Sequence, residues 1–198
     1  MNGSLHTAGG PSWKPLTVGF TSIFALFGSS AAACLWLFLA RFAGFIAVLL
    51  TFVLARRLGG RREGLLAGAT LLLATEFLFN VVRGDSEGLL VALVLGAILA
   101  QLNRHPRAAF LLGIAAGLLR PEVWPLIGLH GLWMIHATRR WTTALLVVGS
   151  GIAMVAMWIV PELIGSGDPF RAATRSQNLV PGSPGSTAFP FGATFVNA

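Results

Sequence analysis

The charged side chains in this chain that are best suited to chemistry stand in four short polar segments. They are Lys14, Arg83, Asp85, Glu87, Arg120, Glu122 and Asp168. Ammonium and guanidinium groups bind phosphate oxygens, and carboxylates accept hydrogen bonds from hydroxyl groups. If the fold brings these segments together, they would form a site for a polar substrate that carries an anionic group.

Each of these residues also has a purely structural interpretation. Asp85 and Glu87 can form a solvated turn, and Arg120 can pair locally with Glu122. Asp85, Glu87 and Asp168 carry oxygen ligands of the kind that bind metal ions, but their spacing is not that of a metal-binding motif. The sequence therefore predicts neither a metal ion nor an organic cofactor.

The residues around these charges are those of a membrane protein. Hydrophobic residues make up 55% of the 198 positions and charged residues 11%, against about 25% charged residues in soluble domains. Residues 31–55 carry one charge and residues 141–160 carry none, and about 20 such residues cross a bilayer core as a helix. We therefore predict an all-α, polytopic transmembrane helical bundle in the cell membrane.

The arginines set the predicted orientation of this bundle. Eight of the 14 basic residues lie in three short loops, at residues 56–62, 104–107 and 139–140. Loops of this kind stay on the cytoplasmic side, so we expect the polar segments and both ends of the chain on the extracytoplasmic side. The same placement accounts for the net charge of +7, and we expect no nucleic-acid partner.

We expect one transmembrane domain over residues 1–198, divided into three parts. Residues 1–30 would form an outer segment with an interfacial helix, residues 31–163 the transmembrane helices, and residues 164–198 an outer loop. Ser30 would cap the first long helix. The membrane segments are expected at residues 31–55, 64–82, 89–102, 108–137 and 141–161.

Residues 108–137 are predicted to form a short, broken hairpin. Basic loops flank both ends, so this segment must cross outward and return, and each arm is only roughly 22 Å long against about 30 Å of hydrocarbon. Pro121 breaks the helix after Arg120. Arg120 and Glu122 would then lie at a tip below the membrane surface, where charges need protein or a wet cavity around them.

Other polar and small residues inside the membrane segments are expected to serve packing. Arg41 and Glu76 would form a buried ion pair, and His130 and His136 would be packing or interfacial residues. Two GxxxG pairs suit close helix contacts: Gly64 with Gly68, and Gly113 with Gly117.

Several features spread over nearly the whole chain form a recognisable series. Pro15-Leu16 precedes an apolar stretch, Phe27-Gly28 precedes a long helix that carries Arg41, and this helix ends at Arg56-Arg57-Leu58-Gly59-Gly60. The series continues with Gly84-Asp85-Ser86-Glu87, then Leu119-Arg120-Pro121-Glu122, then Gly167-Asp168-Pro169-Phe170. Together they resemble the GT-C glycosyltransferases that use polyprenyl-phosphate sugars, such as protein O-mannosyltransferases and aminoarabinose transferases.

This resemblance implies inverting sugar transfer from a lipid-phosphate donor on the extracytoplasmic face. The implied partners are a polyprenyl-phosphate-linked sugar and membrane lipid. Carried over to this sequence, the phosphate contacts would be made by Arg120 first, then by Lys14 and Arg83. Contacts to the sugar or acceptor hydroxyls would be made by Asp85, Glu87 and Glu122.

The family pattern also places a catalytic acid in the first outer loop, after an initial transmembrane helix. Here no acid precedes Glu63, so we expect a chain truncated at its start and, lacking a closing helix, at its end. The catalytic residue stays unassigned, and so does activity of this chain alone. Two alternatives remain open: a transporter or flippase-like carrier, or a non-catalytic membrane assembly subunit.

Overall fold

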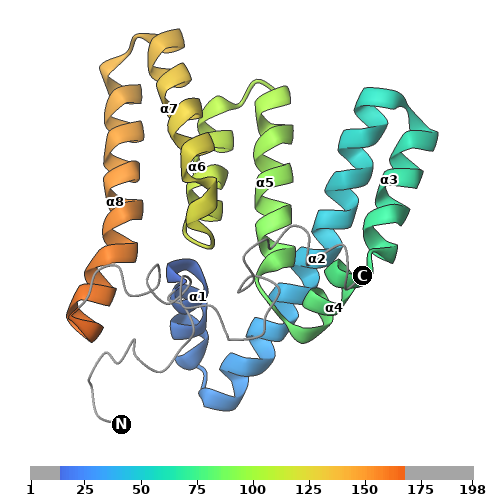
Figure 1. The fold of residues 1–198 in the computed structure, drawn as a ribbon, viewed down its shortest axis with the longest axis horizontal. Coiled ribbons are helices and arrows are strands. Elements are labelled where there is room, and N and C mark those ends of the chain that lie inside the picture. The colour runs from blue at the N-terminus through green and yellow to red at the C-terminus, as the bar shows by residue number, and fades with distance from the viewer. Residues whose placement is uncertain (1–13, 168–198) are drawn as a thin grey trace, which may run out of the picture. The chain divides into compact units, whose positions relative to one another are not determined.

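The computed structural model describes residues 14–167, apart from the side chain of Ser166, and this part of the chain is entirely helical (Figure 1). Its elements are α1 Pro15–Ala25, α2 Ser29–Gly59, α3 Arg61–Leu73, α4 Thr75–Arg83, α5 Glu87–Leu102, α6 Pro106–Gly117, the 3-10 turn η2 Pro121–Val123, α7 Trp124–Thr138 and α8 Trp141–Ser166. No strand occurs in these residues, and the all-α prediction is confirmed. Asp168 and both ends of the chain lie outside the described residues.

Residues 14–157 form one compact unit, and residues 158–167, the last turns of α8, belong to another. Within residues 14–167, two helices are long and apolar enough to cross a membrane: α2 with 31 residues and α8 with 25 of its residues. A third span results if α3 and α4 are taken together, although they are bent by 61° at their junction. A multi-pass membrane protein is therefore supported. The division of the chain at residues 30 and 163 stays a prediction.

Glycine and proline stand at several helix ends, and the expected side-chain cap does not form. α2 begins one residue before Ser30, and its N-cap is Gly28 without any side-chain cap hydrogen bond, so the predicted Ser30 cap is wrong. α1 and α6 each begin with a proline, whose missing N–H costs nothing in a first turn. α8 continues through Pro161 to Ser166, beyond the predicted end.

The predicted single span over residues 64–82 is broken at Ala74, which has an extended backbone between α3 and α4. The predicted ion pair inside this region is also wrong. Within residues 14–167, no ion pair joins Arg41 to Glu76; instead, Arg41 Nη2 donates to the carbonyl oxygen of Val82 at 3.0 Å. Arginine suits this place, because the last carbonyls of α4 carry partial negative charge.

Small residues let α2 and α5 approach until their backbones touch. A Cβ added at Gly88 would lie 3.0 Å from both the N and the Cα of Gly44, and one added at Gly44 would lie 2.6 Å from a methyl group of Val81. Ala43, one residue from Gly44, is buried with Leu89 and with Leu119 of the hairpin. This contact therefore joins α2, α5 and the hairpin in one core.

The predicted glycine pairs also lie at close helix contacts. A Cβ at Gly64 would lie 2.9 Å from the carbonyl oxygen of Phe52, so α3 packs closely on α2 there. A Cβ at Gly117 would lie 2.8 Å from Ile127. The two arms of the hairpin, α6 and α7, are therefore in close contact at this point. The hairpin itself is confirmed, with α6 and α7 joined through η2.

The loops of the 14–157 unit divide between its two ends. In Figure 1 the connections α2–α3, α5–α6 and α7–α8 lie at the upper end of the view, and α1, the α4–α5 turn and the hairpin tip lie toward the lower end. The three arginine-rich loops are thus at one end, and the polar segments at Lys14, at residues 83–87 and at residues 120–122 lie at the opposite end. Which side of a membrane each end faces stays a prediction.

We expect Gly88→Ala to lower the free energy of unfolding by about 1–3 kcal/mol, because its Cβ meets backbone that cannot turn away. Gly149→Ala in α8 is the matched control, since nothing lies within 4 Å of its added Cβ. The control should be neutral or more stable by up to about 1 kcal/mol. Thermal unfolding in detergent measures both variants, and equal effects at the two positions would contradict the close contact.

Candidate functional site

Three polar segments that are distant in the sequence meet at one end of the 14–157 unit. Lys14 Nζ donates to Ser86 Oγ at 3.0 Å, and Arg120 Nη2 donates to Glu87 Oε1 in an ion pair. We call these four residues, Lys14, Ser86, Glu87 and Arg120, the polar cluster. The sequence predicted that their segments would converge, and within the described residues they do.

The first turn of α1 is attached directly to the hairpin. The backbone N–H of Leu16 donates to the carbonyl oxygen of Leu118 at 3.3 Å. Leu16 and Phe20 then pack on the core that contains buried Leu119. Lys14 and Arg120 are therefore held on neighbouring pieces of backbone, although one precedes α1 and the other follows α6.

The turn between α4 and α5 is fixed by α2. Trp36 Nε1 donates to the carbonyl oxygen of Gly84 at 2.9 Å. Gly84 has a φ of +80°, and a Cβ there would lie 2.4 Å from a methyl group of Leu37. The left-handed backbone therefore favours glycine at this position, and a larger residue would also have to displace the Leu37 side chain. The turn delivers Glu87 to the start of α5, where the helix dipole favours a carboxylate.

The polar cluster is partly shielded from solvent and is not fully hydrogen-bonded. The Ser86 residue is 4% exposed, and the Arg120 and Glu87 side chains are 39% and 25% exposed. Arg120 Nε and Glu87 Oε2 are buried and have no hydrogen-bond partner among the described residues. Buried polar atoms are normally paired, so these two atoms are suited to contact a bound molecule or water.

The remaining predicted site residues lie outside this cluster. Arg83 and Asp85 form an ion pair of 3.7 Å between exposed side chains, and Arg83 also lies over the ring of Phe79. Glu122 is exposed and forms no ion pair within residues 14–167. The alternative of a local Arg120–Glu122 pair is therefore wrong, because the partner of Arg120 is Glu87.

Lys14 differs from the other two predicted phosphate-binding cations. Arg83 and Arg120 each pair with a carboxylate, whereas Lys14 forms no ion pair within residues 14–167. Its ammonium group has three N–H donors, and Ser86 takes one of them. The structure therefore leaves Lys14 as the cation of the cluster whose charge is not neutralised by a described carboxylate.

The described residues hold no group of three or more His, Cys, Asp or Glu side chains that could bind a metal ion. His130 contacts Gln101, with 3.2 Å between Nε2 and Oε1, and stacks on Trp133. This is the packing role expected from the sequence. His136 is exposed in the last turn of α7.

Sequence reasoning missed two residues that shape the site. Ser86 lies between two more conspicuous acids, although a hydroxyl can both donate and accept. Trp36 lies in an apolar helix, where an indole usually serves packing. Only the indole N–H of Trp36, which needs a partner when it is buried, gave any signal.

Comparison with known families gives one match. Residues 14–179 match the sequence model of the family described as Glycosyltransferase family 87. The matched region contains every residue of the polar cluster. Comparisons with curated proteins and with solved structures give no match.

We expect Arg120 and Glu87 to be energetically coupled. Glu87→Gln and Arg120→Gln should each destabilise the protein, and the double variant should lose less than the sum of the two. Because both side chains are partly exposed to solvent, we expect a coupling free energy of about 1 kcal/mol between them. Thermal or denaturant unfolding in detergent gives the coupling, and strictly additive losses would show that the two side chains do not interact.

Proposed function

This chain belongs to glycosyltransferase family 87, a family of GT-C membrane glycosyltransferases, and from that premise we propose that it transfers a sugar from a polyprenyl-phosphate donor on the extracytoplasmic face of the membrane. Family membership supplies the reaction class, with a sugar donor and an acceptor. The lipid-phosphate donor, the membrane face and the residues are our proposal. The observation that carries it is the polar cluster, where Lys14 and Arg120 lie together at the end opposite to the arginine-rich loops.

Lys14 is the first candidate for binding the donor phosphate. Its ammonium group has unused N–H donors and no described carboxylate partner. Arg120 is the second, because its buried Nε has no described partner and a guanidinium contacts phosphate through several N–H groups. Arg83 is more exposed and paired with Asp85, so we assign it to the approach of the substrate.

The carboxylates are assigned to the sugar and acceptor hydroxyls. Glu87 shares Arg120 with an incoming phosphate, so phosphate binding would weaken the ion pair and release a carboxylate beside the sugar. Glu87 Oε2 is already without a described partner. Asp85 and the exposed Glu122 lie on the turn and on the hairpin tip, where an acceptor can reach them.

The reaction follows from these contacts. An acceptor hydroxyl oxygen attacks the anomeric carbon of the sugar, and the bond from this carbon to the phosphate oxygen breaks. The electron pair remains on the departing lipid phosphate, and the proton of the hydroxyl goes to a base that we do not assign. Fixed cations at Lys14 and Arg120 would stabilise the growing negative charge of the phosphate in a site partly shielded from water.

A carrier remains the second candidate, and one observation bears on it. The α3–α4 bend at Ala74 is a second discontinuity besides the hairpin, as carriers with broken helices require. The family assignment favours the transferase.

We expect Lys14→Gln and Arg120→Gln each to weaken binding of undecaprenyl phosphate by roughly 10- to 100-fold, the range for a lost hydrogen bond to a charged group. Arg120→Lys keeps the charge but loses the planar fork, so binding should fall between wild type and Arg120→Gln. The measurement is retention of the radiolabelled lipid by the purified full chain, with sugar transfer in membranes as a second readout.

Arg140→Gln is the matched control, because this arginine is exposed in the loop at the opposite end. Thermal unfolding confirms that all variants are equally folded. Unchanged retention in the Lys14 and Arg120 variants would make the polar cluster structural and remove the basis for a phosphate-linked donor.

The proposed face can be tested by cysteine labelling in whole cells. Ser86 is buried and unsuitable, so the labelled variants are Glu122→Cys and Arg140→Cys in a Cys34→Ser background, both at exposed positions. A membrane-impermeant maleimide should label the first from outside and the second only after permeabilisation. Labelling of both from the same side would refute the topology.

A further inference from the structure

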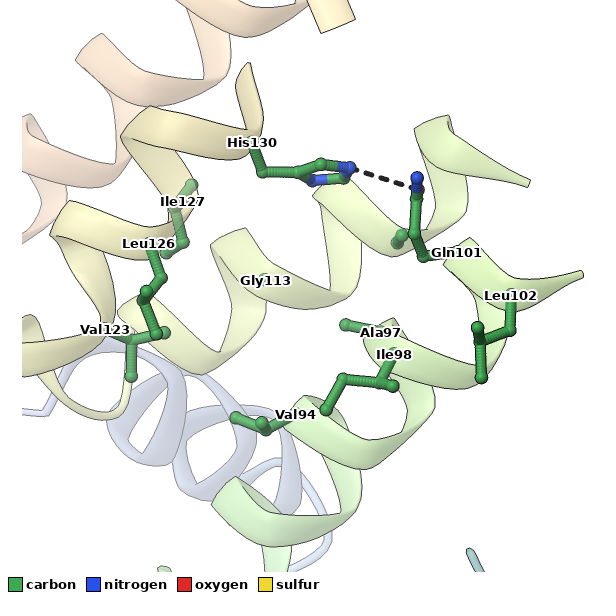
Figure 2. Close-up of a pocket in the computed structure, with 11 residues that line it drawn as sticks. Val94, Ala97, Ile98, Gln101, Leu102, Gly113, Val123, Leu126, Ile127 and His130 are labelled. Atoms are coloured by element: carbon green, nitrogen blue, oxygen red, sulfur yellow. Dashed lines mark hydrogen bonds between the residues drawn. The ribbon is translucent and has the colours of Figure 1, made fainter. Parts of the chain in front are cut away.

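A groove of about 320 Å³ runs between α5 and α7, with α6 behind it. Figure 2 shows Val94, Ala97 and Ile98 of α5 facing Leu126 and Ile127 across Gly113 of α6. The lining is almost entirely apolar. Its volume is at the lower end of the range for small-molecule sites, about 300–1,000 Å³, and its shape follows roughly 12 Å of α5 from Val94 to Leu102.

The groove has one polar place, near the C-terminal end of α5. There Gln101 contacts His130 across the groove, with 3.2 Å between Oε1 and Nε2 (Figure 2). The amide nitrogen of Gln101 has no described partner of its own and remains a hydrogen-bond donor. This is also the end farthest from the polar cluster, because Gln101 lies roughly 21 Å along α5 from Glu87.

A basic hollow adjoins this end of the groove. It is formed by the α5–α6 loop, with Arg104, His105 and Arg107 in its lining. Both arginines are exposed, and neither forms an ion pair within residues 14–167. Residues 88–121 contain no acid at all. The hollow therefore combines uncompensated positive charge with an apolar groove that begins one or two residues away on both helices.

The loop is held in place from α2. Arg57 donates to Asn103 Oδ1 at 2.5 Å and to the carbonyl oxygen of Leu102 at 3.2 Å. Arg57 is thereby occupied in positioning the loop, while Arg104 and Arg107 remain available to a ligand.

From these observations we propose that the groove and the α5–α6 loop bind one molecule of an anionic glycerophospholipid, separate from the polar cluster. One acyl chain lies in the apolar groove, and Gln101 donates to an ester carbonyl at its polar end. Arg104 and Arg107 contact the phosphate of the head group. Basic pockets between membrane helices recognise anionic head groups in this way. The proposal does not rest on the glycosyl transfer.

The chemistry favours a phospholipid over a free phosphate or a neutral lipid. A free phosphate would use the arginines but leave the apolar groove empty. A neutral lipid would fill the groove but leave two unpaired cations beside it. An amphiphile with an anionic head satisfies both parts of the site, and membrane phospholipids reach it from the bilayer.

The test compares retention of phosphatidylglycerol and phosphatidylcholine by the purified full chain, measured by native mass spectrometry. Wild type should retain phosphatidylglycerol preferentially. Ala97→Phe, which fills the groove, and the double variant Arg104→Gln/Arg107→Gln should each reduce its retention by roughly tenfold or more. The matched controls are Ala153→Phe on an exposed position of α8 and Arg139→Gln/Arg140→Gln in the neighbouring basic loop, and both should retain the lipid normally.

Three results would overturn the proposal. Equal retention of phosphatidylcholine would show that the arginines contribute no selectivity. Displacement of phosphatidylglycerol by an equal concentration of inorganic phosphate would show a simple anion site. Loss of undecaprenyl phosphate binding in Ala97→Phe would assign the groove to the chain of that lipid. The exposed arginine variants keep the test informative if Ala97→Phe unfolds, which its melting temperature would reveal.

Discussion

The rest of the structure depends on the backbone contact between α2 and α5 at Gly44 and Gly88. In a membrane, apolar side chains gain little from leaving lipid, so helices associate where small residues allow close approach. Gly88 is the residue directly after Glu87, and the contact therefore fixes where α5 begins. A larger residue at this point would move the carboxylate of Glu87 away from Arg120 and loosen the core around Ala43 and Leu119.

Charge is distributed between the two ends of the unit in two different ways. The polar cluster contains two cations and one carboxylate, and Lys14 is the cation that lacks a carboxylate partner among the described residues. At the arginine-rich end, Arg104 and Arg107 of the α5–α6 loop form no ion pair within residues 14–167. The first arrangement suits a ligand that exchanges with existing partners during a reaction, and the second suits a ligand that stays bound.

The helical class, the long spans and the hairpin could be predicted, because the length of an apolar segment, the place of a proline and the place of arginines each determine structure in their own part of the chain. The partners of individual charges could not. The backbone of Arg120 is extended before Pro121, which turns its side chain from Glu122 toward Glu87 on another helix. Arg41 donates to the carbonyl oxygen of Val82 near the end of α4 and pairs with no carboxylate among the described residues. The break at Ala74 has no sequence signal, since alanine is the best helix former.

The hydrogen bond from Lys14 to Ser86 joins residues 72 positions apart, and this separation orders the assembly of the protein during synthesis. α1 leaves the ribosome before its partners on α5 and on the hairpin, so at first it can pack only on α2, the next helix in the chain. Contacts this distant in the chain form late, since the intervening loop must close before they gain anything. The contacts that bring Lys14 to the polar cluster therefore form only after α5 and the hairpin have been inserted.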